Sequence, residues 1–118
     1  MANKLFSQSI WFATNIKKVF SLLGLANKAG RLKSGEFMTE QCLKDGSARL
    51  VIVADDASDN TKKHFKDMCD YRHVPIIFFG NKEDIGHAIG KELRASVVVN
   101  DEGFASSILE KVGFREVM

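Results

Sequence analysis

Apolar residues recur at helical spacing in residues 15–30. Five of them, spaced three or four apart, form one apolar face: Ile16, Val19, Phe20, Leu23 and Ala26. Gly30 suits the left-handed backbone that ends many helices, so the pattern predicts a helix over residues 15–30. Residues 1–14 lack a clean period. We therefore expect them to form an amino-terminal extension outside a single domain of residues 15–118.

A short extended stretch and a second helix are predicted next. Leu32 is the apolar centre of residues 31–33, which favour an extended backbone. Ser34 has a side chain that commonly caps the start of a helix, and Gly46 provides a stop. The sequence therefore predicts a helix over about residues 35–45.

Three short apolar runs then alternate with three further helices. The runs 49–54, 75–79 and 96–99 are rich in β-branched or aromatic residues and predict strands. The first run is apolar throughout, which is typical of a strand buried on both faces at the centre of a sheet. The helices are expected to start at Ser58, at Asn81 paired with Asp84, and at Asn100 or Asp101. Their inward residues are Thr61, Phe65, Met68 and Cys69, then Ile85 and Ile89, then Phe104, Ile108 and Val112.

This alternation predicts an α/β fold. Helices that separate the strands cover both faces of a sheet, which gives a three-layer α/β/α sandwich. We expect a mixed, roughly four-stranded sheet with parallel character.

Composition narrows the class of protein. The chain has 118 residues, 45% of them hydrophobic, which suits one domain with one core. Seventeen basic residues against fifteen acidic ones give a net charge of +2, so any attraction for nucleic acid must come from local clustering. No apolar run approaches the ~20 residues that cross a bilayer. Cys42 and Cys69 form no CxxC pair and indicate buried thiols in a reducing compartment, so we expect a cytoplasmic protein without membrane contact.

Candidate catalytic groups have simpler explanations. No glycine-rich phosphate-binding loop occurs. Asp55, Asp56 and Asp59 could bind a metal, but they also suit the positive amino end of the helix that follows, and we favour that capping role. Cys69 and His73 form a single C-x3-H pair without further ligands. We therefore expect no enzyme activity, no metal and no cofactor.

One segment has the character of an anion-binding site. Residues 27–35 contain Lys28, Arg31 and Lys33 and no acidic residue. The free N–H groups of the following helix start, near Gly35 and Glu36, can bind a phosphate that the cations attract. This arrangement makes nucleic acid a candidate partner.

Several short motifs in this order resemble a known family. They are residues 24–30 (GLANKAG), Ser34 and Gly35, residues 50–56, and residues 86–92. Together with the order of elements they resemble the seven-Ae class of ribosomal proteins, and most of all its small bacterial YlxQ-type members, over about residues 17–112. The resemblance implies a non-catalytic α/β/α sandwich that binds kink-turn RNA. It also implies that the partners are structured RNA, ribosomal RNA in particular, and ribosomal or other ribonucleoprotein components. It implies no binding to DNA.

The resemblance places the RNA contacts on two segments. The first is the start of the second helix, and the second is the loop before the last strand. With the basic segment added, the candidate RNA surface consists of Lys28, Arg31, Lys33, Gly35, Glu36, Phe37, Met38, Gln41, Lys91, Glu92, Leu93 and Arg94.

Three positions of this surface depart from the family pattern. Kink-turn binders have Gly-x-Asn-Glu-x-x-Lys here, whereas Phe37, Met38 and Gln41 occupy the three polar positions. Phe37 can stack on an unpaired base or pack into the core. The alternative is a protein-interaction module that keeps the fold, exposes Phe37 and Met38, and has lost RNA readout.

Overall fold

The computed structural model describes the backbone of residues 2–113 and the side chains of residues 15–113. Within these residues the helices are α1 (Ala2–Lys28), α2 (Glu36–Lys44), α3 (Asp59–Arg72), α4 (Lys82–Ala88) and α5 (Glu102–Lys111). The strands are β1 (Leu32–Ser34), β2 (Leu50–Val53), β3 (Ile76–Phe78) and β4 (Ser96–Val99). None of the helices in this part of the chain combines the length and apolar character needed to cross a membrane.

The strands form one mixed sheet in the order β1-β4-β2-β3. β4 is antiparallel to both β1 and β2, and only β2 and β3 are parallel. The predicted mixed sheet is confirmed, but its parallel character is limited to this single pair. The direction of β4 could not be predicted, because an alternation of helices and strands does not determine strand direction. β4 runs antiparallel to both of its neighbours.

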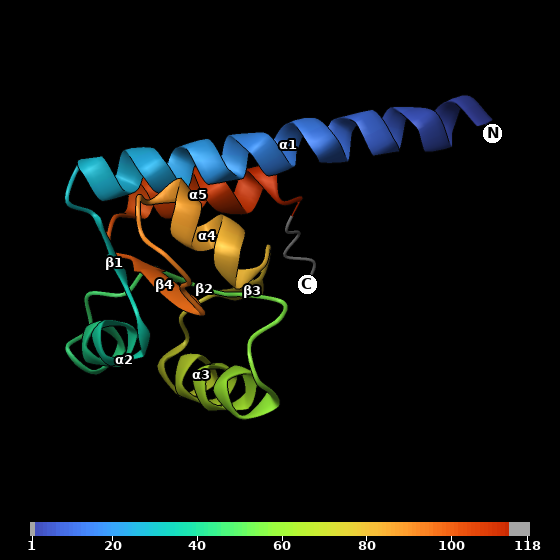
Figure 1. The fold of residues 1–118 in the computed structure, drawn as a ribbon. Helices are drawn as coiled ribbons and strands as arrows, with labels where there is room; N and C mark the ends of the chain where they lie inside the picture. The colour runs from blue at the N-terminus through green and yellow to red at the C-terminus, as the bar shows by residue number, and fades with distance from the viewer. Residues whose placement is uncertain (1, 114–118) are drawn as a thin grey trace.

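Helices cover both faces of the sheet, which confirms the three-layer sandwich. α1, α4 and α5 lie on one face, and α2 and α3 lie on the other (Figure 1). β2 and β4 are buried at every position, as expected for the sheet centre, because each has a strand on both sides and helices above and below. Leu23, Phe65 and Ile108 bring the helices onto this core.

α1 begins much earlier than the apolar pattern predicts. It is continuous from Ala2, not from Asn15, and its first half projects past the rest of the molecule (Figure 1). A helix satisfies its hydrogen bonds internally, so it can continue where no apolar face marks it. The predicted helix start was therefore wrong, while the division into an extension and a domain stays a prediction.

Most predicted helix caps are confirmed. The side chains of Ser58, Asn81 and Asp101 accept hydrogen bonds from backbone N–H groups in the first turns of α3, α4 and α5. The predicted cap at Ser34 was wrong, because Ser34 belongs to β1 and Gly35 precedes α2. Gly35 has a φ of 97°, a conformation that side chains disfavour, and it provides no side-chain cap.

Candidate nucleic-acid interface

Two segments distant in the sequence meet at the start of α2. The Gly35 N–H donates to the Ser96 carbonyl at 2.9 Å, and Arg94 Nε donates to Ser34 Oγ at 3.1 Å. Thr39 and Ser96 add a buried hydroxyl contact of 3.2 Å. These bonds hold the segment before β4 against the turn between β1 and α2, so the two parts of the candidate RNA surface are adjacent.

α4 shapes the second segment. The Lys91 N–H donates to the Gly86 carbonyl at 2.8 Å, and the Arg94 N–H donates to the Lys82 carbonyl at 3.1 Å. The chain after α4 thus folds back along that helix. A Cβ on Gly86 would lie 1.3 Å from the Glu92 carbonyl oxygen, so this close approach requires glycine.

The basic residues spread along β1. The Asn27 side chain donates to the Ile89 carbonyl at 3.2 Å, which places the end of α1, including Lys28, beside the start of the second segment. The Arg31 carbonyl accepts from the Asn100 N–H, which lies at the opposite end of β1 from Gly35. Arg31 is thus about 13 Å from Gly35 at ordinary strand spacing. Lys28, Arg31 and Lys33 are exposed, and they lie at the end of α1, directly before β1 and within β1.

The start of α2 presents N–H groups to this surface. The first turn of a helix has N–H groups without intrahelical partners, and Gly35 adds no side-chain acceptor. Because aligned peptide dipoles also make this end partly positive, it favours an anion.

Two large apolar side chains stand out beside these groups. Phe37 is 71% exposed and Leu93 is 59% exposed, and they come from the two different segments. Phe37 therefore does not pack into the core, while Met38 is half-buried and Gln41 is exposed. The exposed ring offers a flat face to a ligand.

Acidic groups limit the surface on one side. Glu36 and Glu40 lie one turn apart on α2, and His64 Nε2 of α3 is 2.7 Å from Glu40 Oε2. In the part of the chain that the structure describes, these three side chains are the one group spaced closely enough to hold a metal ion. A hydrogen bond accounts for the short contact. The carboxylates repel phosphate, so this side of α2 is unsuited to an anion, and Glu36 lies on it although the resemblance counts Glu36 among the contact residues.

Residues 17–110 match the model of the Ribosomal protein L7Ae/L30e/S12e/Gadd45 family. The chain belongs to this family. RNA-binding protein YlxQ of Bacillus subtilis is 41% identical over 90 residues, which are 76% of this chain and 90% of that protein. RNA-binding protein YlxQ of Enterococcus faecium is 39% identical over 98 residues, which are 83% of this chain and 94% of that protein.

Solved structures share the fold. A Bacillus halodurans protein of unknown function has a TM-score of 0.79 and 36% identity, and the match covers 81% of this chain and 97% of that one. The Giardia lamblia 15.5kD RNA binding protein has a TM-score of 0.70 and 23% identity, over 83% of this chain and 85% of that one. The second likeness supports the architecture alone.

In this L7Ae-family chain two of the three aspartates lie at helix starts, but at two different helices. Asp59 lies in the first turn of α3, where Ser58 is the cap. Asp56 Oδ1 instead accepts from the Lys82 N–H at 2.9 Å, at the start of α4. The prediction that Asp56 serves α3 was wrong, because its partner is 26 residues away in the sequence.

Cys69 and His73 lie in different surroundings in this family member. Cys69 is fully buried, and burial raises the pKa of its thiol to about 12. A thiol that stays protonated is a poor metal ligand and nucleophile. His73 is exposed and ends α3 in a left-handed conformation with a φ of 58°.

Sequence reasoning missed the residues that join the two segments. Ser34 fixes Arg94, and Asn27 fixes the end of α4, yet neither was assigned such a role. The signal was present for Asn27, since an amide at the end of an amphipathic helix commonly bonds a neighbouring backbone group.

Proposed function

We propose that this L7Ae-family chain binds structured RNA through the candidate RNA surface, as a non-catalytic ribonucleoprotein component in the cytoplasm. The observation that carries the proposal is the Arg94–Ser34 hydrogen bond, which joins the two RNA-contact segments beside the free N–H groups of α2. The name RNA-binding protein YlxQ, borne by relatives about 40% identical, supports the same role.

Kink-turn-like RNA is the proposed class of ligand, with ribosomal RNA as its source. A bent RNA exposes phosphates that can contact Lys28, Arg31 and Lys33, and it exposes unpaired bases that can stack on Phe37. Phe37, Met38 and Gln41 cannot reproduce the hydrogen bonds of an Asn-Glu-Lys set, so recognition depends more on stacking and phosphate contacts. Each base-specific hydrogen-bonding pair that is missing lowers discrimination between bases by about 1–3 kcal/mol.

The electrostatic part of the proposal predicts a definite salt dependence. Contacts to about three phosphates give a slope of log affinity against log salt of roughly −2 to −3. The Arg31→Glu, Lys33→Glu double variant should bring this slope to about −1, because each phosphate contact contributes close to one unit. Fluorescence anisotropy with a labelled ribosomal kink-turn RNA measures both.

A charge-matched control separates local contacts from net charge. The Lys17→Glu, Lys18→Glu double variant changes two exposed lysines on α1 that lie about 15 Å or more along the helix from Lys28. It should keep the steep slope. A flat salt dependence in the unaltered chain, or equal loss in both double variants, would contradict the proposed surface.

The exposed Phe37 ring tests base stacking. Phe37→Ala should weaken RNA binding by about 1–3 kcal/mol, because stacking on an aromatic ring contributes that much per base. The free energy of unfolding should change by less than about 0.5 kcal/mol, since the side chain is exposed. Isothermal titration and urea denaturation give the two values.

Tyr71→Ala is the matched control for Phe37→Ala. Tyr71 is 79% exposed near the end of α3 and lies outside the candidate RNA surface, so its loss should leave RNA affinity unchanged. Unchanged RNA affinity in Phe37→Ala as well would favour the alternative function, a protein-interaction module that uses exposed Phe37 and half-buried Met38.

A further inference from the structure

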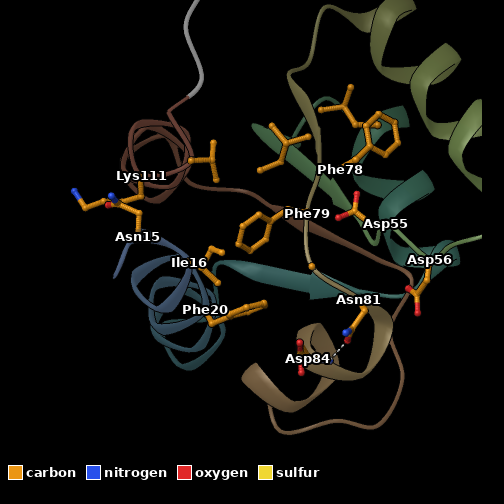
Figure 2. A pocket seen from close by; sticks show the side chains of 14 residues that line it. Asn15, Ile16, Phe20, Asp55, Asp56, Phe78, Phe79, Asn81, Asp84 and Lys111 are labelled. Carbon is orange, nitrogen blue, oxygen red and sulfur yellow. Dashed lines mark hydrogen bonds between the residues drawn. The ribbon is translucent and has the colours of Figure 1, made fainter. Parts of the chain in front are cut away.

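A groove lies at the other edge of the sheet, along β3. This groove has a volume of about 860 Å³ and receives residues from α1, β3, α4 and the end of α5 (Figure 2). Its apolar side is formed by Ile16, Phe20, Phe79 and Val112. The ring centroids of Phe20 and Phe79 lie 5.2 Å apart, and the ring planes are tilted by 47°, so the two side chains pack against each other on this side of the groove.

β3 presents an open backbone edge to this groove. In the described sheet it is the last strand and pairs with β2 alone. The Pro75 carbonyl and the Phe79 N–H bond to β2 at 3.0 Å each. Because parallel strands direct alternate residues to opposite sides, the N–H and carbonyl groups of Ile76 and Phe78 point away from β2. Phe78 is 39% exposed, and Ile76 and Phe78 both line the groove, so this edge borders it.

Carboxylates gather at the carboxyl end of β3. Asp55 follows β2, and Asp56 and Asp84 lie near the start of α4, while Lys111 lies across the groove (Figure 2). Asp55 and Asp56 are exposed. This end repels phosphate and favours a basic side chain, which argues for a protein partner over RNA.

We infer that the groove binds an extended protein segment that adds a strand to β3. The Ile76 and Phe78 backbone groups would pair with the segment's backbone, which supplies affinity in strand addition. Apolar side chains at alternate positions would pack on Phe20 and Phe79, and an Arg or Lys would lie beside Asp55. β1 and β3 are opposite edges of the sheet, so this partner leaves the candidate RNA surface free. The inference does not depend on RNA binding.

Two synthetic peptides test strand addition. Each has five residues of alternating Val and Thr, followed or preceded by two Arg residues, so that parallel and antiparallel addition both place Arg near Asp55. Nuclear magnetic resonance titration of the full chain should show saturable shifts of the Ile76 and Phe78 amides with one of them. Methylating alternate peptide nitrogens should weaken that binding at least tenfold, since backbone pairing is lost. Absence of shifts at millimolar peptide, or indifference to methylation, overturns the inference.

A charge exchange tests the role of Asp55 by both a loss and a recovery of peptide affinity. Asp55→Lys should weaken binding of the Arg peptide at least tenfold, and a peptide with Glu in place of both Arg residues should regain affinity for that variant. Equal affinities across all four combinations overturn the assignment of the acidic end. The RNA affinity of Asp55→Lys should stay within twofold of that of the unaltered chain. A failure of the RNA proposal can therefore be distinguished from a failure of this inference.

A shortened chain that ends at Gly113 tests whether residues 114–118 of the same chain compete with the peptide for the groove. Residues 114–118 follow Gly113, the residue after Val112 of the groove wall, and their sequence FREVM contains three apolar residues, one basic residue and one acidic residue. Equal peptide affinity for the full and shortened chains supports an external partner. Binding by the shortened chain alone assigns the groove to residues 114–118 and overturns the inference.

Discussion

At the scale of one residue, Gly86 sets the position of residues 91–94, the second segment of the proposed RNA surface. Gly86→Ala would place a methyl group 1.3 Å from the Glu92 carbonyl oxygen. Alanine favours a helix by about 1 kcal/mol over glycine, but the clash with backbone outweighs that gain. We expect the free energy of unfolding to fall by about 1–3 kcal/mol, measured by urea denaturation.

Gly103→Ala is the control for helix propensity. Gly103 lies in α5, and the atom nearest to an added Cβ would be the capping oxygen Asp101 Oδ2 at 3.1 Å, which needs to move by only a few tenths of an ångström, a cost that the better helix propensity of alanine offsets. Stability should change little there. If both alanine variants were equally stable, the close approach of residues 86 and 92 would not limit the fold.

Local rules predict single residues well when the partner is near in the sequence. Ser58, Asn81 and Asp101 cap N–H groups three residues ahead, so their types and spacing indicated them. Ser34 and Asp56 have partners 60 and 26 residues away, which no local pattern specifies. The candidate site was therefore located by segment from the family resemblance, whereas the bonds that join its parts required the fold.

α4 is the element that holds residues 91–94, the second segment of the proposed RNA surface. It has seven residues, and its start is held by Asn81 Oδ1, which accepts from the Asp84 N–H at 2.7 Å, and by Asp56. Asn81→Ala should lower the free energy of unfolding by about 0.5–2 kcal/mol, because a capping acceptor is lost. Fraying of α4 should also speed hydrogen exchange at the Arg94 N–H, which bonds Lys82.

Asn60→Ala provides the comparison for Asn81→Ala. Asn60 is exposed in the first turn of α3, where Ser58 already serves as cap. Its loss should affect neither stability nor exchange at Arg94. Normal exchange at Arg94 in the Asn81 variant would show that the segment keeps its place without an intact α4 start.

Elements were predictable where an apolar face marks them. Helices α2 to α5 and the strands were expected near their observed bounds, because buried positions recur at the period of each element. The start of α1 was missed since residues 2–14 show no such face. The apolar pattern also could not predict strand directions, because the same apolar run fits a parallel or an antiparallel strand.

At the scale of the whole molecule, the projecting half of α1 tests the domain boundary. A chain that begins at Asn15 should retain cooperative thermal unfolding, because Val19 and Leu23 are the first α1 side chains that reach the core among those described. Its midpoint should fall by no more than a few degrees, in line with a change of about 1 kcal/mol or less. Loss of a single cooperative transition in calorimetry would place residues 1–14 inside the domain.

The position of β4 constrains how the chain matures on the ribosome. β4 lies between β1 and β2, although both of those strands are synthesised long before it. Until residues 96–99 have been synthesised, β1 has no partner strand and β2 has only β3, so the centre of the sheet cannot close. A middle strand that arrives after both of its neighbours raises the sequence separation between paired strands, which slows folding, and it leaves strand edges exposed that chaperones can protect in the meantime.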